Sequence, residues 1–365
     1  MKIPFVDLRA QYLQLQNEID SAIKSVIDQT AFISGAYATK FETSFANYIQ
    51  LKNVIACANG TDSLEILFKT MGIGLGDEVI VPAISWISTS EAVSAVGAKP
   101  VFVDVDQNNL INIDLIENTI TKKTKAIIPV HLYGNPVDMK KIMDVANRYN
   151  LKVLEDCAQS HGATSHGKLA GTFGNCASFS FYPGKNLGAY GDAGAMATND
   201  DHIATIARAI ANHGQQGKHN HIMEGRNSRM DGIQAAILDV KLPHLEDWTN
   251  KRIQNAALYD KFLSDNITKP KVNENGKHVY HLYVIRHSRR DALAQYLKEH
   301  GIETAVHYPI PLPLMPCYTL QPKEAEKNYP VATKAANEIL SLPMYAELTE
   351  EQIRYVSEKI NEFEI

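Results

Sequence analysis

The sequence has little cysteine, no long apolar run and no block of basic residues. Its four cysteines, Cys57, Cys157, Cys176 and Cys317, are scattered without Cys-x-x-Cys spacing, which argues against a disulfide framework or a metal site. No run approaches the roughly 18 apolar residues of a membrane span, and residues 1–9 lack the apolar core of a signal peptide. We therefore expect a cytoplasmic protein with no metal and no membrane partner.

The charge balance excludes another class of partner. The chain has 41 acidic and 36 basic residues, a net charge of −5, so nucleic acid is not its expected ligand. Hydrophobic residues make up 45% and charged residues 21%, as in ordinary globular proteins. A length of 365 residues is large for one core and predicts a large domain plus a smaller one.

Short apolar runs alternate with helix-like segments from residue 54 to about residue 197. Such alternation is typical of an α/β domain with a mostly parallel sheet wrapped by helices. Several runs end in polar residues, and ligands of open α/β sheets bind at strand ends. The predicted strands are Val54–Cys57, Glu78–Val81, Pro100–Val103, Lys125–Val130, Val153–Glu155 and Ala177–Phe181.

The predicted pattern of helices and strands changes in the last third of the chain. Residues 231–264 predict one or two long helices, and a smaller α+β unit follows Pro270. Its expected elements are a strand at Tyr280–Ile285 and helices at Arg290–Glu299 and Glu350–Phe363. We predict a large ligand-binding domain at 1–245 and a small C-terminal domain at 246–365 that includes the linking helix.

Lys185 stands in a glycine-rich stretch that follows a strand broken by Pro183-Gly184. Pyridoxal phosphate (PLP) chemistry needs such a lysine, a carboxylate facing the pyridine nitrogen, and donors for the phosphate. Asp156, at the end of an upstream strand, would be the carboxylate, and Gly60-Thr61 would open the helix that cradles the phosphate. Trp86 would cover the ring.

Each of these residues also has an ordinary structural role. A lysine in a polar loop is most often a solvated charge, Asp156 could cap a turn, and a lone Trp86 is more often core filler. Separate structural roles do not explain why all of them fall at strand ends of one α/β domain.

Motifs along nearly the whole chain resemble the DegT/DnrJ/StrS family of sugar aminotransferases, which are fold type I PLP enzymes. The resemblance implies a mostly parallel seven-stranded sheet in the large domain and a smaller α+β domain. The segments that carry it, in order, are residues 3–12, 58–64, 76–82, 155–162, 180–188, 226–231, 304–312 and 340–344.

The resemblance assigns roles to matching positions. Lys185 would bind PLP as an imine and act as general base and acid, and Asp156 would pair with the pyridine nitrogen. Gln159 would lie near the ring hydroxyl. The residues implied to hold the phosphate are Gly60, Thr61 and Ser180.

Asn227 matches a family asparagine that reaches the cofactor phosphate of a partner subunit, which implies a homodimer with shared active sites. Gly184 departs from the threonine or serine common in relatives, and this affects a minor contact. The family's sugar dehydratases carry histidine where this chain has Lys185, so the lysine favours transamination over a PLP-dependent dehydratase.

The implied reaction moves the amino group of L-glutamate to a nucleotide-linked keto-sugar in surface-glycan synthesis, such as lipopolysaccharide and O-antigen. Arg229 is the candidate for a substrate carboxylate because arginine suits planar bidentate binding, although it could be structural. His307 and Tyr308 would line the sugar pocket, or form a buried turn. The histidine-rich loop 212–221 would lie near the substrate.

The motifs favour amination at C3 of UDP-3-keto-N-acetylglucosamine, its uronic acid or a dTDP-3-keto-6-deoxyhexose. Relatives that aminate C4 share most of these motifs, so C4 remains the alternative.

Overall fold

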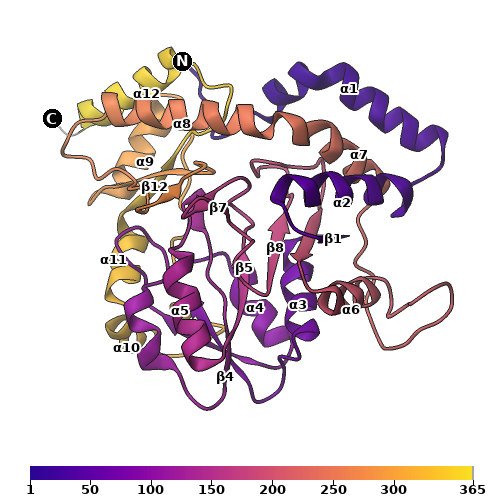
Figure 1. Ribbon diagram of the computed structural model, residues 1–365. Helices are drawn as coiled ribbons and strands as arrows, with labels where there is room; N and C mark the ends of the chain where they lie inside the picture. The colour runs from indigo at the N-terminus through magenta and orange to yellow at the C-terminus, as the bar shows by residue number, and fades with distance from the viewer. Residues whose placement is uncertain (364–365) are drawn as a thin grey trace.

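A computed structural model of the chain describes residues 1–363 and contains a seven-stranded central sheet with helices on both faces (Figure 1). The strand order is β1-β9-β8-β5-β4-β2-β3, and only β9 runs antiparallel to its neighbours in this sheet. This confirms the mostly parallel sheet. Its strands are β1 (Asn53–Cys57), β2 (Glu78–Pro82), β3 (Lys99–Val103), β4 (Thr124–Ile127), β5 (Lys152–Asp156), β8 (Cys176–Ser180) and β9 (Gly194–Thr198).

All six strands predicted between residues 54 and 181 belong to this sheet. Their central residues are mostly apolar because both faces are covered: in β2, Val79 and Val81 enter one core and Ile80 enters the other. The strand that the sequence did not reveal is β9, Gly-Ala-Met-Ala-Thr, whose small residues have little strand propensity. Burial between β1 and β8 stabilises it as a strand.

Two layers of helices cover the sheet. On one face α3 (Gly60–Thr70), α4 (Ser88–Ala95) and α6 (Asp201–Ala211) bury a core that includes Phe68 and Ile210. The opposite face is covered by α2 (Gly35–Ile49), α5 (Met139–Tyr149) and α7 (Gly232–Lys241).

The C-terminal part forms a smaller α+β unit around the antiparallel pair β11 (Tyr283–Arg286) and β12 (Ile339–Leu342). Its helices α9 (Arg290–Glu299) and α12 (Glu350–Phe363) have the bounds that the sequence predicted. The long α8 (Leu245–Phe262) links the two units and packs on α12 (Figure 1). Ile3 bridges to Ile302 and is fully buried in this unit, so the start of the chain returns to its C-terminal part. The division at residue 245 remains a prediction.

The remaining helices and strands are short, apart from α1, which packs against α7. They are α1 (Leu8–Asp28), α10 (Pro322–Ala325), α11 (Pro330–Glu338), β6 (Thr164–Ser165), β7 (Lys168–Leu169) and β10 (Gly276–Lys277). No helix within residues 1–363 has the length and apolar character needed to cross a membrane. Single 3-10 turns lie at 113–115, 117–119, 132–134, 242–244, 312–314 and 326–328.

Candidate active site

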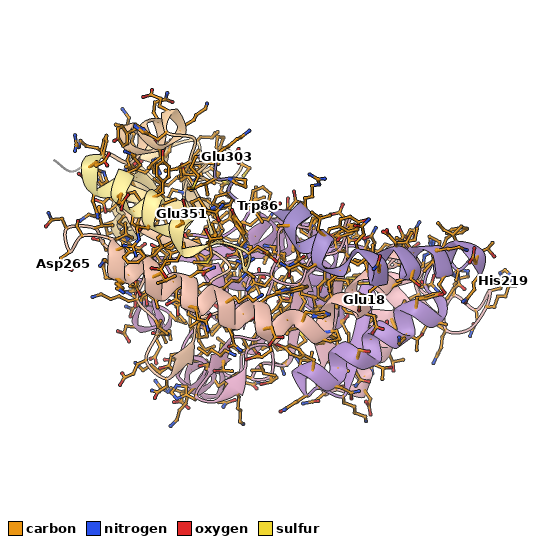
Figure 2. All side chains as sticks on the ribbon, turned by 90° about the horizontal axis from the view of Figure 1, so that it is seen from above. Glu18, Trp86, His219, Asp265, Glu303 and Glu351 are labelled. Atoms are coloured by element: carbon orange, nitrogen blue, oxygen red, sulfur yellow. The ribbon has the colours of Figure 1, made fainter. Side chains whose placement is uncertain are left out.

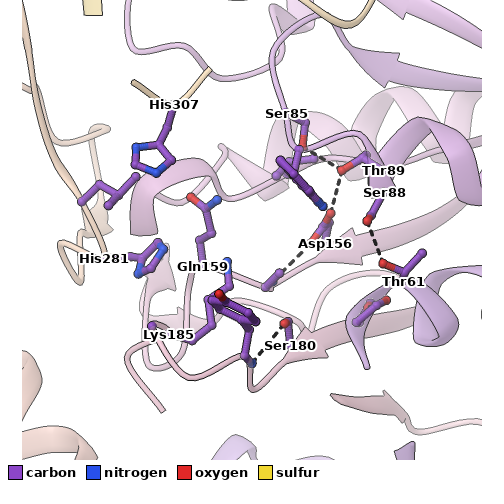
Figure 3. A pocket seen from close by; sticks show the side chains of 18 of the residues that line it. Thr61, Ser85, Ser88, Thr89, Asp156, Gln159, Ser180, Lys185, His281 and His307 are labelled. Carbon is purple, nitrogen blue, oxygen red and sulfur yellow. Dashed lines mark hydrogen bonds between the residues drawn. The ribbon is translucent and has the colours of Figure 1, made fainter. Parts of the chain in front are cut away.

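A cavity of about 560 Å³ opens where β1, β5 and β8 end, between the sheet and the C-terminal unit. Figure 3 shows polar side chains converging on it from both sides. Most of the residues proposed from the sequence line it. They are Gly60, Thr61, Trp86, Asp156, Gln159, Ser180, Lys185, His307 and Tyr308.

One end of the cavity is the N-terminus of α3. The Asn59 side chain accepts a hydrogen bond from the Asp62 amide at 2.8 Å. The amides of Gly60 and Thr61 lie in the first turn of the helix and therefore have no intrahelical acceptor. A Cβ on Gly60 would lie 2.8 Å from Cβ of Ser180, so only glycine lets the helix terminus approach this serine so closely. Unpaired amides, a helix dipole and a serine hydroxyl together form an anion cradle.

Asp156 lies at the end of β5 on the floor of the cavity and is 5% exposed. Its carboxylate accepts hydrogen bonds from the Thr89 hydroxyl at 2.9 Å and from the Ala158 amide at 3.1 Å. Burial raises the pKa of the Asp156 carboxyl, and these two donors and the Lys185 ammonium oppose that shift. None of the ion pairs found within residues 1–363 includes Asp156, so a cationic partner in the cavity would stabilise its ionised form.

Lys185 follows β8, and its amide donates to the Tyr182 carbonyl at 2.8 Å in the turn formed by Pro183-Gly184. Burial lowers the pKa of the Lys185 ammonium to about 8, and the Asp156 carboxylate acts in the opposite direction. A lysine with a lowered pKa has a larger neutral fraction near neutral pH than a solvated lysine and can act as a nucleophile. The lowered pKa and the position of Lys185 in the cavity wall argue against the solvated-charge interpretation.

The wall opposite α3 contains His307 and Tyr308. The Gln159 amide donates to the Tyr308 hydroxyl at 3.2 Å, and the ring of Phe5 stacks on His307 with centroids 5.7 Å apart. Burial lowers the pKa of His307 to about 4, helped by the Lys185 charge, so this imidazole is neutral at physiological pH. Its Nδ1 lies 2.8 Å from the Ser341 hydroxyl, which fixes the ring.

Trp86 is 58% exposed, with its ring centroid 5.7 Å from that of Tyr308. It is therefore not core filler but an open aromatic face at the rim of the cavity. Its role as a cover for the cofactor ring remains a prediction.

Two residues proposed from the sequence, Asn227 and Arg229, do not line this cavity. Asn227 is exposed and accepts a hydrogen bond from Nε of Arg229 at 3.1 Å. The histidine-rich loop 212–221 leaves the body of the molecule beside α6 (Figure 1), and His219 lies at the far edge from Trp86 (Figure 2). Within one chain this loop is not near the substrate pocket.

The lining residues that were not proposed from the sequence include Ser85, Ser88, Thr89 and His281. Ser88 lies 2.7 Å from the Thr61 hydroxyl, and Ser85 lies 2.7 Å from Thr89 (Figure 3). The run of hydroxyls around Trp86, directly after a predicted strand, was the available signal. No pattern pointed to His281, because its place depends on how the C-terminal unit packs.

A buried group beneath the site has a structural role. His131, Glu155 and Cys157 lie close enough together to suggest metal ligands. However, the Glu155 carboxylate already accepts bonds from three backbone amides and lies 3.1 Å from His131. Since these contacts use its acceptor positions, Glu155 fixes the loop 171–174 under β5.

The cavity residues fit PLP. The cradle between Gly60 and Ser180 suits a phosphate, the buried Asp156 lacks the cation that a protonated pyridine nitrogen would supply, and Lys185 offers a reactive amine. Such a lysine and carboxylate at the strand ends of a mostly parallel sheet define a fold type I PLP enzyme.

Comparison with known proteins identifies the group within that class. Residues 13–361 match the model of the DegT/DnrJ/EryC1/StrS aminotransferase family. A "pleiotropic regulatory protein" of Geobacillus stearothermophilus is 47% identical over 100% of this chain and 99% of its own. UDP-2-acetamido-2-deoxy-3-oxo-D-glucuronate aminotransferase of Pseudomonas aeruginosa is 42% identical over 97% of this chain and 98% of its own.

The crystal structure of DesV from S. venezuelae, in complex with a ketimine intermediate, superposes with a TM-score of 0.96. It is 40% identical, and the match covers 99% of this chain and 98% of that one. The chain therefore belongs to the DegT/DnrJ/EryC1/StrS family and is a PLP-dependent aminotransferase.

Proposed function

We propose that this protein transfers the amino group of L-glutamate to C3 of a UDP- or dTDP-linked keto-sugar. The observation that carries the proposal is that Lys185, the buried Asp156 and the neutral His307 line one cavity. The name of the 42% identical Pseudomonas relative, which acts on a UDP-linked 3-oxo sugar, supports C3.

PLP, when bound, supplies an electron sink for the carbon that exchanges its proton. Lys185 would remove that proton and return it, because burial lowers the pKa of its ammonium to about 8 and so raises the fraction of free amine near physiological pH. Asp156, oriented by the Thr89 hydroxyl, would keep a proton on the pyridine nitrogen. Gly60, Thr61 and Ser180 would hold the phosphate.

The sugar would occupy the space between Trp86 and His307. Trp86 and Tyr308 present aromatic faces to a sugar ring. The neutral His307 can donate a hydrogen bond to a sugar hydroxyl or accept one from it. Cationic recognition of the glutamate carboxylate or the diphosphate comes from Arg229, which the cavity of one chain does not contain.

We therefore also propose a homodimer in which Asn227 and Arg229 of one protomer complete the cavity of the other. Asn227 is exposed in one chain, as a residue that reaches into a partner must be. The apolar side chains of Leu13, Ile27, Phe32 and Ile33 are about half exposed and would be covered by the partner. A cytoplasmic location and a role in surface-glycan synthesis such as O-antigen follow from the substrate.

The test is turnover by purified protein against UDP-, dTDP- and GDP-linked keto-sugars, with the product located by mass and NMR. We expect L-glutamate to bleach the visible band of the lysine-bound cofactor and a 3-amino sugar to form. A colourless protein after PLP addition would refute the whole proposal. A 4-amino product would refute C3 and establish the alternative, and bleaching only by another amino acid would refute the donor.

A further inference from the structure

A second cavity, of about 260 Å³, lies between the large domain and the C-terminal unit, and nothing in the proposed reaction uses it. In the part of the chain that the structure describes, it shares no lining residue with the active-site cavity. Its walls come from the loop 107–109, Tyr133, the segment 268–271, Arg286 of β11 and Lys334 of α11. Together with His278, six separate segments therefore meet around it.

The walls carry an excess of positive charge. The lining cations are Lys269, Lys271, Arg286 and Lys334, against a single carboxylate, Glu338, among the lining residues within 1–363. Two of these cations have acidic partners: Glu338 lies 3.9 Å from Nζ of Lys334, and Asp265 lies 3.9 Å from Nζ of Lys269. Arg286 is held in place by the Gln107 carbonyl at 3.0 Å and the Asn109 side chain at 2.7 Å, both neutral. The protein as a whole carries a net charge of −5, so this local excess is not an average property of its surface.

His278 adds a directed donor. It is 4% exposed and lines this cavity. Its Nδ1 accepts the Tyr280 amide at 2.8 Å, which places the proton of the neutral ring on Nε2. No bond from Nε2 occurs within the described residues, although the ring is almost completely buried. Nε2 is not among the fully buried unpaired atoms of the described residues, so it is accessible from the cavity and can donate to a ligand there.

Tyr133 joins the two cavities. It lines the second cavity, while its amide donates to the Gln159 side chain at 2.6 Å and its hydroxyl donates to the His307 carbonyl. Its φ is 62°, a left-handed conformation that is unusual for a bulky residue and is retained here by these bonds. A ligand in the second cavity would therefore contact a residue that supports the side chain of Gln159 and the backbone of His307 in the active site.

We infer that the cavity formed by Arg286, Lys271 and His278 binds a small phosphate-bearing anion between the two units. Phosphate or a phosphate ester suits a site with several cations and a neutral N–H donor, and a volume of about 260 Å³ excludes a nucleotide sugar in full. Binding would tie the loop 107–109 to the segment 268–271 and so stabilise the arrangement of the two units.

The experiment is isothermal titration calorimetry of the PLP-loaded protein with two probes, pyrophosphate and glucose 1-phosphate. Saturating UDP is present to block the diphosphate site expected in the active-site cavity. The test variant is Lys271→Ala/Lys334→Ala, since neither amine has a contact closer than 3.9 Å with another side chain within the described residues. The control is Lys122→Ala/Lys123→Ala. These two exposed lysines lie directly before the start of β4, and neither lines the second cavity.

We expect the test variant to weaken binding of the preferred probe roughly tenfold or more and the control to change it less than about twofold, since charge-assisted bonds contribute about 1.5–3 kcal/mol each. His278→Asn keeps an acceptor for the Tyr280 amide, loses the Nε2 donor and should also weaken binding. Preference for pyrophosphate indicates an inorganic ligand, and preference for glucose 1-phosphate indicates a phosphate ester. Equal effects of test and control pairs, or no binding in the presence of UDP, would overturn the inference.

Discussion

The two walls of the active-site cavity differ in how completely one chain builds them. The cofactor wall consists of residues on strand ends and on the α3 terminus: Gly60, Thr61, Asp156, Ser180 and Lys185. The substrate wall consists of residues on loops of the rim and of the C-terminal unit: Trp86, His307 and Tyr308.

Burial and hydrogen bonds separate the two walls. Asp156 is 5% exposed and held by Thr89, whereas Trp86 is 58% exposed and has one aromatic neighbour, Tyr308. The cofactor wall needs one fixed geometry because its chemistry is the same for every substrate of the family. The substrate wall is open, and we propose that Asn227 and Arg229 of a partner complete it. Mutations can test this difference.

The largest effect is expected from Lys185→Ala in the cofactor wall. Loss of the acid–base amine should lower kcat by about 10³-fold or more while the fold is retained, since general acid–base catalysis alone contributes roughly 10²–10⁴-fold. Stopped-flow kinetics measure the loss of kcat, and the visible spectrum measures the loss of the lysine-bound cofactor. Lys168→Ala, at an exposed lysine of β7, is the control and should leave both unchanged. Residual turnover above a tenth of the wild-type rate would contradict the assigned role.

Asp156→Asn should have the next largest effect, lowering kcat by roughly 10²-fold, because the amide cannot keep the pyridine nitrogen protonated. Thr89→Val, which removes the 2.9 Å bond to this carboxylate together with the 2.7 Å contact to the Ser85 hydroxyl, should cost about tenfold, in line with about 1.5–3 kcal/mol for a bond to a charged group. Steady-state kinetics at fixed cofactor occupancy measure both. Asp114→Asn, at an exposed carboxylate, is the matched control. If Thr89→Val lowered kcat more than Asp156→Asn does, Thr89 would have a role beyond orienting the carboxylate.

Asn227→Ala tests whether the cavity is shared. We expect a loss of about tenfold, the cost of one hydrogen bond to a phosphate. Mixing this variant with Lys185→Ala and allowing subunits to exchange should restore about a quarter of wild-type activity, because half of the dimers then hold one intact site of two.

Recovery of activity on mixing depends on sharing. If Asn227 acted within its own chain, each hybrid site would lack either the lysine or the asparagine, and mixing would give only the average of the two variants. A monomer by light scattering would refute the dimer directly. The Lys168→Ala protein mixed with Lys185→Ala is the control for mixing itself and should keep about half of wild-type activity whether or not subunits exchange.

The sequence predicted the cofactor wall better than the substrate wall for a physical reason. Asp156 and Ser180 lie at the ends of apolar strands, and strand ends of a parallel sheet meet at one edge, so spacing along the chain implied proximity. Glycines that permit close approach, such as Gly60, are also visible in sequence. Strand β9 was not predicted, because Gly194–Thr198 forms a strand through its packing and not through its strand propensity.

The rest of the site depends on contacts between distant segments. His281 enters the cavity only because the C-terminal unit folds back over the sheet, and Phe5 reaches His307 only because the N-terminus pairs with Gly301. The loop 212–221 was expected beside the substrate, but it extends to the edge of the chain (Figure 2). Periodicity reports on local structure and gives no information about such long-range placement.

The smallest expected effect concerns pH and compares the two walls electrostatically. Burial sets the pKa of Lys185 at about 8, so the rate at which apoprotein attaches PLP should rise about tenfold per unit below pH 8 and level off above it. Asp156 raises this pKa, so Asp156→Asn should move the plateau to lower pH. His307, already neutral above about pH 4, should contribute no inflection, and His307→Gln should leave the profile in place. Stopped-flow absorbance from pH 6 to 10 measures all three proteins. A wild-type rate still rising at pH 10 would mean that Lys185 is solvated in the apoprotein, and the cofactor wall would then form only when its ligand binds.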